Sequence, residues 1–353
     1  MPSRVFLLDA SQMDRWDEFV QKHPLGSIYH TSSWRDVVQG TYSLEPFYFA
    51  LIDESGEIQA GLPLFEIRSF LTRNRFSTLP CAQSCDPLVS NEEQYLEIKK
   101  VVLQFAGEKN LNGWELKTSH LFPFETHAAR ASVTKYFTYV LDIAEPVDVL
   151  FSHFHKSFIQ RSIKKAYRSG LSLKCCDSIE EVRYFHRLYL HMRRQKGLLP
   201  QPGLFFDNLW NVMKRENRID ILFASYRGMI ISGVMLLKYG ERVIYEYGAT
   251  RPGYHRFSPS PFLLWEAIQR SKAEGYRLFD FGRTASSEEN LSLFKKRWGA
   301  TLQPFFYSDL IKGSDSSSLR RNKKMKTLMS LVMRVLPDWA CDYAGRLLYK
   351  HLL

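Results

Sequence analysis

The order of predicted helices and strands is repeated along this chain of 353 residues. In the first half, helical patterns over residues 11–40 precede strand patterns and one further helix: Phe47–Ile52, Ile58–Ile67, Phe76–Leu79, the helix Asn91–Glu108 and the buried strand Trp114–Lys117. After two helices within residues 179–217, the second half has the same order: Ile221–Tyr226, Ile230–Tyr239, Val243–Ala249, the helix Ser258–Ala273 and the strand Arg277–Phe281. Because a crossover helix permits parallel pairing, the repeat predicts a duplicated α/β (α+β) domain with mixed sheets.

The two halves also agree in the detail of their hairpins. Ala50 and Gly61 are expected to face each other in the first hairpin, and Ala224 and Gly233 in the second. Helices followed by a β-meander, a crossover helix and a further strand resemble the acetyltransferase-type (GNAT) fold, which is expected here in tandem. We predict an N-terminal GNAT-like domain over 1–145, a C-terminal GNAT-like domain with the active site over 146–312, and a tail over 313–353.

The composition places the chain among globular proteins, since 45% of its residues are hydrophobic and 14% are aromatic. No uninterrupted apolar run reaches the roughly 18 residues of a transmembrane helix, and the N-terminal apolar run is too short for a signal peptide. The five cysteines are therefore expected to be reduced thiols of a cytoplasmic protein. Cys81 and Cys85 have no second pair at ligand spacing, so neither a metal nor a bound cofactor is expected.

The net charge of +11 is concentrated in two segments. Residues 156–174 hold six basic residues and no acid, whereas residues 320–353 hold eight basic residues and two aspartates. Four basic residues of the first segment share one face of a helix expected over 158–168: Arg161, Lys164, Lys165 and Arg168. Because a solvated helix face usually mixes both signs of charge, we interpret this face as a site for a phosphate-bearing ligand.

The tail starts with a flexible linker at 313–318 and continues in two helical patterns separated by Pro337. Apolar residues recur at helical spacing in both patterns: Leu328, Leu331, Val332, Val335 and Leu336, then Trp339, Tyr343, Leu347 and Leu348. A basic cluster at Arg320–Lys326 precedes them. A basic amphipathic helix with aromatic anchors is typical of contact with an anionic membrane, but a helix packed on its own core has the same pattern, and both interpretations stay open.

Opposed charges and aromatic residues are densest in the stretch 279–299. Asp280 and Arg283 stand at the C-terminal end of a strand, where α/β folds often bind ligands, although they could also pair with each other. Lys295 lies beside Phe294 and Trp298 on a short predicted helix. A lysine among aromatic rings commonly extends along them to solvent, but it can also hold a phosphate or stabilise an oxyanion, as acyl transfer requires.

The strand end Tyr245–Ala249 carries two further groups with acid–base chemistry. Tyr247 can relay a proton and Glu246 is an alternative base, on opposite faces because strand side chains alternate. Ordinary strand packing is the simpler explanation of either residue taken alone. Motifs of other chemistries are missing from the sequence, including the Gly-x-x-x-x-Gly-Lys-Ser/Thr loop, His-Glu-x-x-His and Gly-x-Ser-x-Gly.

Several of these blocks resemble the Fem-type aminoacyltransferases, and most closely the FemAB-like subgroup of the GNAT superfamily. The two clearest are Phe279-Asp-Phe-Gly-Arg283 and Phe294-Lys-x-x-Trp-Gly299. Four shorter elements extend the resemblance over most of residues 12–310: Arg161–Leu171, Tyr247-Gly-Ala249, His30-x-x-x-Trp34 and Gly61-Leu-Pro-Leu64.

The resemblance implies transfer of an acyl group, typically an amino acid from aminoacyl-tRNA, to an amine such as a peptidoglycan-precursor side chain. It implies that Lys295 helps the transferred carbonyl and that Asp280 and Arg283 line the same cleft. The chain departs from some members in having no long coiled-coil arm. It also lacks the loop that grips the pyrophosphate of coenzyme A in many acetyltransferases, since Arg251–Arg256 occupies that position. Acetyl-CoA is therefore the less expected donor.

The sequence thus predicts an acyl- or aminoacyltransferase that forms an amide on a peptidoglycan- or surface-polysaccharide-related cell-envelope precursor. The expected catalytic residues are Lys295, Asp280 and Tyr247, and the expected substrate-binding residues are Arg161, Lys164, Lys165, Arg251 and Arg283. Expected partners are a phosphate-bearing envelope precursor, aminoacyl-tRNA, and the inner face of the cell membrane through residues 320–353. A CoA-dependent N-acyltransferase and a non-catalytic protein that binds nucleic acid or an anionic membrane are the alternatives.

Overall fold

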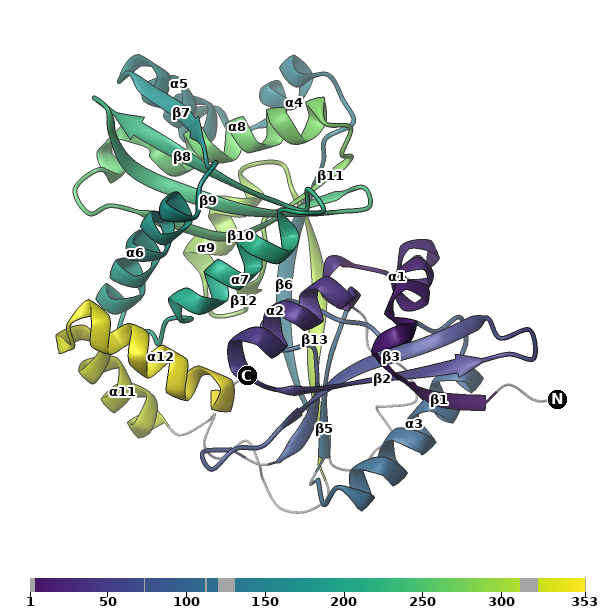
Figure 1. Cartoon of the computed structure of the whole chain (residues 1–353). Coiled ribbons are helices and arrows are strands. Elements are labelled where there is room, and N and C mark those ends of the chain that lie inside the picture. Colours follow the sequence, from purple (N-terminus) through teal and green to yellow (C-terminus); the bar gives the residue numbers. More distant parts are fainter. Residues whose placement is uncertain (1–3, 73, 112, 120–130, 312–322, 353) are drawn as a thin grey trace. The chain divides into compact units, whose positions relative to one another are not determined.

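The computed structural model describes residues 4–72, 74–111, 113–119, 131–311 and 323–352 (Figure 1). The chain divides into two compact units. Unit 1 comprises residues 1–136, 304–326 and 346–353, and unit 2 comprises residues 137–303 and 327–345.

Unit 1 is a mixed sheet with helices on both faces. Over residues 4–118 its helices and strands are, in chain order, β1 (Arg4–Leu8), α1 (Met13–Lys22), α2 (Ser32–Tyr42), β2 (Glu45–Ile52), β3 (Ile58–Ile67), β4 (Arg75–Thr78), α3 (Glu92–Glu108) and β5 (Gly113–Thr118). The strands follow the order β1-β2-β3-β4-β5, and only β4 and β5 of these are paired in parallel. The crossover helix α3 buries Tyr95, Ile98 and Val102 against one face of the sheet.

Unit 2 repeats this arrangement. Its elements are α4 (Val147–His153), a π-helical turn (Lys156–Gln160), α5 (Arg161–Arg168), β7 (Leu171–Cys175), α6 (Ile179–Gln195), α7 (Gly203–Met213), β8 (Ile219–Tyr226), β9 (Met229–Tyr239), β10 (Arg242–Thr250), α8 (Pro259–Ala273), β11 (Leu278–Asp280), β12 (Thr284–Ala285) and α9 (Glu289–Lys296). The strand order is β7-β8-β9-β10-β11, again with one parallel pair, β10 and β11. The predicted tandem of GNAT-like α/β folds is therefore confirmed.

A shared packing device shows how closely the two units correspond. Gly61 of β3 lies under the Trp16 ring of α1, and a Cβ atom at Gly61 would come within 2.3 Å of that ring. Gly233 of β9 lies under Phe185 of α6 in the same way, at 2.8 Å. In both units a glycine in the central strand lets an aromatic ring from a covering helix, α1 or α6, contact the sheet.

The predicted hairpin registers are correct in one unit and shifted in the other. Ala50 does pair with Gly61. In unit 2, however, Gly233 pairs with Phe223, and Ala224 pairs with Ser232. The prediction for the second hairpin was therefore wrong by one residue. The register of that hairpin shifts between Ala224 and Ser225, and a bulge of this kind leaves no clear mark in the sequence.

The last strand of each half pairs in the unit to which it does not belong by sequence. β6 (Ala131–Asp142) follows β5, yet its residues 140–142 pair with β11 in unit 2. β13 (Thr301–Ile311) follows α9, yet its residues 306–311 pair with β5 in unit 1. The units consequently differ from the predicted domains 1–145 and 146–312, because periodicity identifies a strand without identifying its neighbour.

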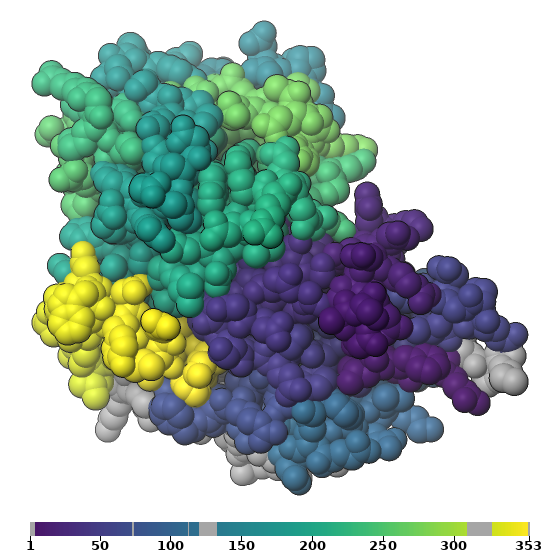
Figure 2. All heavy atoms as spheres, viewed as in Figure 1, coloured from purple at the N-terminus to yellow at the C-terminus, as the bar shows by residue number. Residues whose placement is uncertain are grey.

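The tail forms the two predicted helices, α11 (Lys323–Val335) and α12 (Asp338–Leu352), which lie at the surface in Figure 2. The predicted linker at 313–318 and Arg320 lie outside the described residues. Within unit 2, Asp338 contacts Arg194 of α6 at 2.6 Å, and Asp342 accepts a hydrogen bond from the Gly203 backbone at 2.8 Å. No helix in the described part of the chain is both long enough and apolar enough to cross a bilayer.

Candidate active site

Lys295 is the buried cation at the centre of the candidate site in unit 2. Its side chain is 3% exposed, and its ammonium donates to the carbonyl oxygens of Gly282 at 2.6 Å and Arg283 at 3.2 Å. An ammonium has three N–H donors, so within the part of the chain that the structure describes these two contacts leave one N–H for a ligand. Burial lowers the pKa of Lys295 to about 8, although the Asp280 charge opposes the shift. The lysine therefore does not extend to solvent.

Asp280 ends β11 and fixes the loop to which Lys295 is bonded. Its Oδ1 accepts hydrogen bonds from the Gly282 backbone N–H at 2.8 Å and from the Thr138 hydroxyl. Gly282 has a φ of +74°, a backbone conformation that favours glycine. The backbone of Gly282 thus connects the two charged groups, because its N–H donates to Asp280 and its C=O accepts from Lys295.

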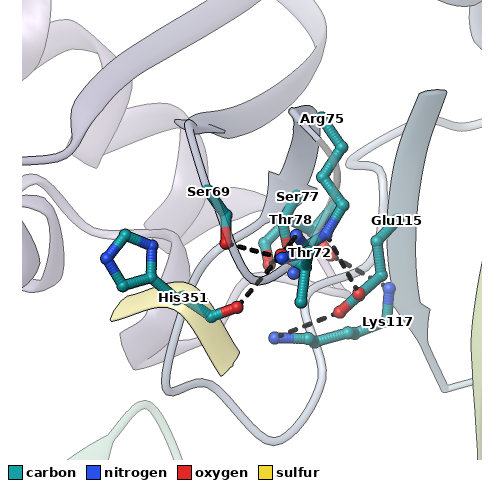
Figure 3. Close-up of polar contacts among 8 residues, drawn as sticks. All are labelled: Ser69, Thr72, Arg75, Ser77, Thr78, Glu115, Lys117 and His351. Atoms are coloured by element: carbon teal, nitrogen blue, oxygen red, sulfur yellow. Dashed lines mark hydrogen bonds and ion pairs between the residues drawn. The ribbon is translucent and has the colours of Figure 1, made fainter. Parts of the chain in front are cut away.

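The cation that contacts Asp280 is Arg242, at 3.1 Å, and not Arg283 as the sequence had suggested. Arg242 is the first residue of β10, the parallel neighbour of β11. Unit 1 has the same arrangement, in which Arg75 opens β4 and contacts Glu115 of the parallel strand β5 at 3.6 Å (Figure 3). A buried acid paired with an arginine at the start of the neighbouring strand is therefore a feature of both units.

The unit 1 pair belongs to a buried polar cluster with a structural role (Figure 3). Lys117 adds a second contact to Glu115 at 3.7 Å. Arg75 also donates to Thr72, whose hydroxyl donates to the backbone carbonyl of His351 near the end of α12, both at 3.0 Å. The cluster therefore fixes the last turn of α12 onto the loop before β4.

Tyr247 lies on the face of the sheet that α6 and α7 cover. Its ring contacts Tyr189 and Phe206 with centroid separations of 5.6 and 5.4 Å. Tyr245 instead packs with the core cluster of α5 and α8. The two tyrosines are on opposite faces because the register shifts between them, so the simple alternation assumed from the sequence does not hold here. The Glu246 charge lies close enough to raise the pKa of Lys295.

The parallel strands β10 and β11 pair only as far as Ile244 and Asp280, and β10 then continues to Thr250. The backbone N–H groups at a helix N-terminus can bind phosphate, and the α-helix that follows β10 is α8. In α8 that terminus begins at Pro259 and has a second proline at Pro261. Neither proline has an N–H, so two of the donors that a helix N-terminus offers to phosphate are missing.

The predicted basic face is exposed on α5. Arg161, Lys164, Lys165 and Arg168 are all exposed, as the interpretation of a binding face requires. Arg251 and Arg256 are exposed in the loop before α8, and α5 contacts the short 3-10 helix His255–Phe257 of that loop. Arg283, which follows β11, is also exposed.

The sequence-based prediction missed three groups of the site. Arg242 and Thr138 contact Asp280 from neighbouring strands, and only the strand order brings them together. The Thr284 hydroxyl, in β12, is buried without a hydrogen-bond partner among the described residues. An unsatisfied hydroxyl directly after Arg283 is available to a ligand, and the run Gly282-Arg283-Thr284 could have pointed to it.

Comparison with known proteins identifies relatives of this site and fold. The sequence profile of the acetyltransferase (GNAT) domain family matches residues 154–296. The chain is 22% identical over 309 residues to the UDP-N-acetylmuramoylpentapeptide-lysine N(6)-alanyltransferase of Weissella viridescens, a match that covers 82% of this chain and 90% of that protein. Over 98 residues it is 26% identical to the lipid II:glycine glycyltransferase of Staphylococcus haemolyticus (strain JCSC1435), covering 26% of this chain and 23% of that protein.

Among solved structures, the crystal structure of FemX has the same fold, with a TM-score of 0.70 at 16% identity over 93% of this chain and 100% of that chain. The GNAT-type match spans the residues from Phe154 to Lys296, which include α5, β11 and Lys295. The family predicted from the Phe-Asp-Phe-Gly-Arg and Phe-Lys-x-x-Trp-Gly blocks is thereby confirmed. In sequence and in fold, this chain is therefore similar to the Fem-type aminoacyltransferases of the FemAB-like group of the GNAT superfamily.

Proposed function

We propose that this protein transfers an acyl group, most simply an aminoacyl group, from an ester donor to an amine of a peptidoglycan- or surface-polysaccharide-related cell-envelope precursor. The relatives are named for transfer of alanine or glycine to a lysine-containing pentapeptide or to lipid II. The single observation that carries the proposal is Lys295, a buried ammonium with one N–H to donate beside the end of β11.

The reaction proposed is direct attack of the amine on the ester carbonyl. The amine nitrogen forms a C–N bond to the carbonyl carbon, and the carbonyl oxygen takes up negative charge. The ester C–O bond then breaks, and the proton lost by the amine ends on the departing hydroxyl. Lys295 donates its remaining N–H to the developing oxyanion, a contact that is stronger in the transition state than in the ester.

Asp280 and Tyr247 have supporting roles in this proposal. The described contacts of Asp280 are all with other groups of the protein. One of them holds the backbone of Gly282, which in turn positions Lys295. We therefore assign it a positioning role in place of the catalytic role expected from the sequence. Tyr247 is the proposed proton relay, since a phenol can pass the proton of the amine onward.

Aminoacyl-tRNA is the donor that the surface of unit 2 favours. The exposed cations of α5, with Arg251 and Arg283, suit a ligand with several phosphates. Pro259 and Pro261 at the start of α8 weaken the position at which an acyl-CoA would place its pyrophosphate. The same cations are proposed to bind the phosphates of the acceptor precursor as well. The enzyme is proposed to work at the inner face of the cell membrane.

A donor comparison tests the proposal. The full chain is incubated with a lysine-containing precursor pentapeptide and either alanyl-tRNA or acetyl-CoA, each carrying a label in its acyl group. Label is expected to enter the peptide from the tRNA ester and not from the thioester. Transfer from acetyl-CoA alone would replace the proposal with a CoA-dependent N-acyltransferase, and transfer from neither donor would remove it.

A further inference from the structure

The helix α11 has two opposite faces, and only one of them is covered. Met333 is buried, and Ser330 on the same side lies against Gly197 at the end of α6. Four apolar residues spaced for the opposite face are exposed: Leu328, Leu331, Val332 and Val335. Val335 is 82% exposed. The helix α11 therefore has apolar side chains on both faces: one face is packed against the protein and the other is exposed to solvent.

The helix α12 presents an outward face of a different composition. Cys341 and Gly345 are buried, and Gly345 lies so close to the Pro200 carbonyl that a Cβ atom would come within 2.5 Å of it. Residues at helical spacing on the other side are aromatic, apolar and basic: Trp339, Tyr343, Arg346, Leu347 and Lys350. Trp339 is 75% exposed, and Tyr343 and Leu347 are also exposed. The Cys341 thiol donates to the Met333 carbonyl at 3.5 Å, so the two helices pack together.

We propose that the outward faces of α11 and α12 form a docking surface for an anionic lipid bilayer. We call these residues the outer face: Leu328, Leu331, Val332, Val335, Trp339, Tyr343, Arg346, Leu347 and Lys350. The inference deepens the proposed function and rests on it only for the choice of partner, since an enzyme that modifies a lipid-linked precursor meets that precursor at a bilayer. The two interpretations of the tail then both hold, because its inner face packs on the protein and its outer face contacts the lipid.

Charge and ring chemistry favour a bilayer over other occupants. Arg346 and Lys350 share the outer face of α12 with Trp339 and Tyr343. Apolar side chains flanked by cations, with a tryptophan and a tyrosine between them, match the acyl chains, phosphates and interface of an anionic bilayer. A surface between two copies of this chain would instead bring these cations together.

A vesicle experiment tests the docking surface directly. The full chain is sedimented with vesicles of equal parts phosphatidylglycerol and phosphatidylcholine, and with vesicles of phosphatidylcholine alone. The chain is expected to bind the anionic vesicles, and the pair Val335→Ser and Trp339→Ser is expected to weaken binding at least about tenfold. Arg346→Glu with Lys350→Glu is expected to weaken binding to a similar extent and to remove the preference for anionic lipid.

Matched variants separate docking from folding. Leu96→Ser with Leu103→Ser changes two exposed leucines of α3, and Lys100→Glu reverses an exposed charge there, so both are expected to bind vesicles as the unchanged chain does. Circular dichroism checks that every variant is folded. Failure of the full chain to bind anionic vesicles, or equal binding by the Val335–Trp339 variant, would overturn the inference. So would a vesicle-free dimer that the Val335–Trp339 variant dissociates.

Activity distinguishes this inference from the proposed function. Outer-face variants are expected to keep transfer to a precursor peptide in solution and to lose transfer to a lipid-linked precursor in vesicles. Vesicle binding without any transfer would defeat the proposed function alone. Transfer to the vesicle-borne precursor that is insensitive to the outer-face variants would defeat the docking surface alone.

Discussion

The ammonium of Lys295 lies 2.6 Å from the carbonyl oxygen of Gly282, and the N–H of the same glycine is held by Asp280. This relationship places a desolvated cation at the end of β11 by means of one residue. It explains why a lysine from α9 and an acid from β11 belong to one site although they do not form an ion pair. The predictions below follow from this geometry and from the duplicated fold that supports it.

Lys295→Met is expected to lower kcat by about 100-fold or more, because one oxyanion donor is typically worth that much, while KM for the acceptor changes little. Steady-state kinetics with a precursor peptide measures both constants. Lys296→Met, at the exposed neighbouring position, is the matched control and is expected to keep kcat. A Lys295→Met enzyme with unchanged kcat would remove Lys295 from the mechanism.

The stability of the protein should also report on Lys295. Its pKa in the folded chain, about 8, is below the ordinary value of 10.5, so the unfolded chain binds more protons between these values. The wild type should therefore gain stability relative to Lys295→Met as pH rises from about 8 to 10.5, by up to roughly 3 kcal/mol. Urea unfolding of both proteins across this range measures the difference, and a constant difference would show that burial does not shift this pKa.

Activity should depend on pH in the opposite direction. Because the protonated ammonium donates to the oxyanion, kcat is expected to fall as pH rises through about 8. Lys295→Arg keeps its charge at every pH studied, so this variant should lack the fall even where its activity is low. A fall that persists in the arginine variant would assign the pH dependence to another group.

Asp280→Ala is expected to destabilise the protein by about 3 kcal/mol, since it leaves Arg242 and the Gly282 N–H without their buried partner. Because Gly282 then no longer fixes Lys295, kcat of the folded enzyme should fall roughly tenfold. The pH at which kcat declines should also change. Glu115→Ala, which breaks the corresponding pair with Arg75 in unit 1, is the matched control. Glu115→Ala should destabilise the protein without changing the pH at which kcat declines.

The contact of a covering helix, α1 or α6, with a central-strand glycine predicts two equivalent mutations. Gly61→Ala would force a Cβ atom against Trp16, and Gly233→Ala would force one against Phe185. Each is expected to destabilise the protein by about 1–3 kcal/mol, measured by thermal unfolding. Gly107→Ala meets no atom within 4 Å on the helix α3 and should stabilise the protein by up to about 1 kcal/mol.

The exposed cations of α5 should set the salt dependence of donor binding. Arg161→Ala and Lys164→Ala are each expected to raise KM for aminoacyl-tRNA and to reduce the slope of log affinity against log salt by about one. Kinetics at several salt concentrations measure this. Lys100→Ala on α3 should leave the slope unchanged, and an equal effect of all three variants would indicate nonspecific attraction.

The sequence predicted most of the fold because its signals are local. The two hairpins and the crossover helices could be read from spacing, and repetition made each half a check on the other. The exchange of β6 and β13 could not be read, since strand pairing depends on a partner far along the chain. The bulge between Tyr245 and Tyr247 was missed for a related reason, because one inserted residue changes the face of a side chain without changing the pattern around it.

The site was predicted in part. Lys295 and Asp280 were identified because they stand at a strand end and among aromatic rings, and the structure connects them through Gly282. Arg242 was missed as the partner of Asp280, since only the parallel pairing of β10 with β11 brings it near. The outer face of the tail was visible as a pattern in the sequence, but only the structure shows which of its residues are exposed.

The mass of the acceptor tests the central claim most directly. A lysine-containing precursor pentapeptide is incubated with the full chain and alanyl-tRNA, and the product is analysed by tandem mass spectrometry, with Lys295→Met and Lys296→Met in parallel. The account predicts a peptide heavier by one alanyl residue on a side-chain amine, formed by the wild type and Lys296→Met and nearly absent with Lys295→Met. An unmodified peptide with every protein, or an equal yield from Lys295→Met, would contradict it.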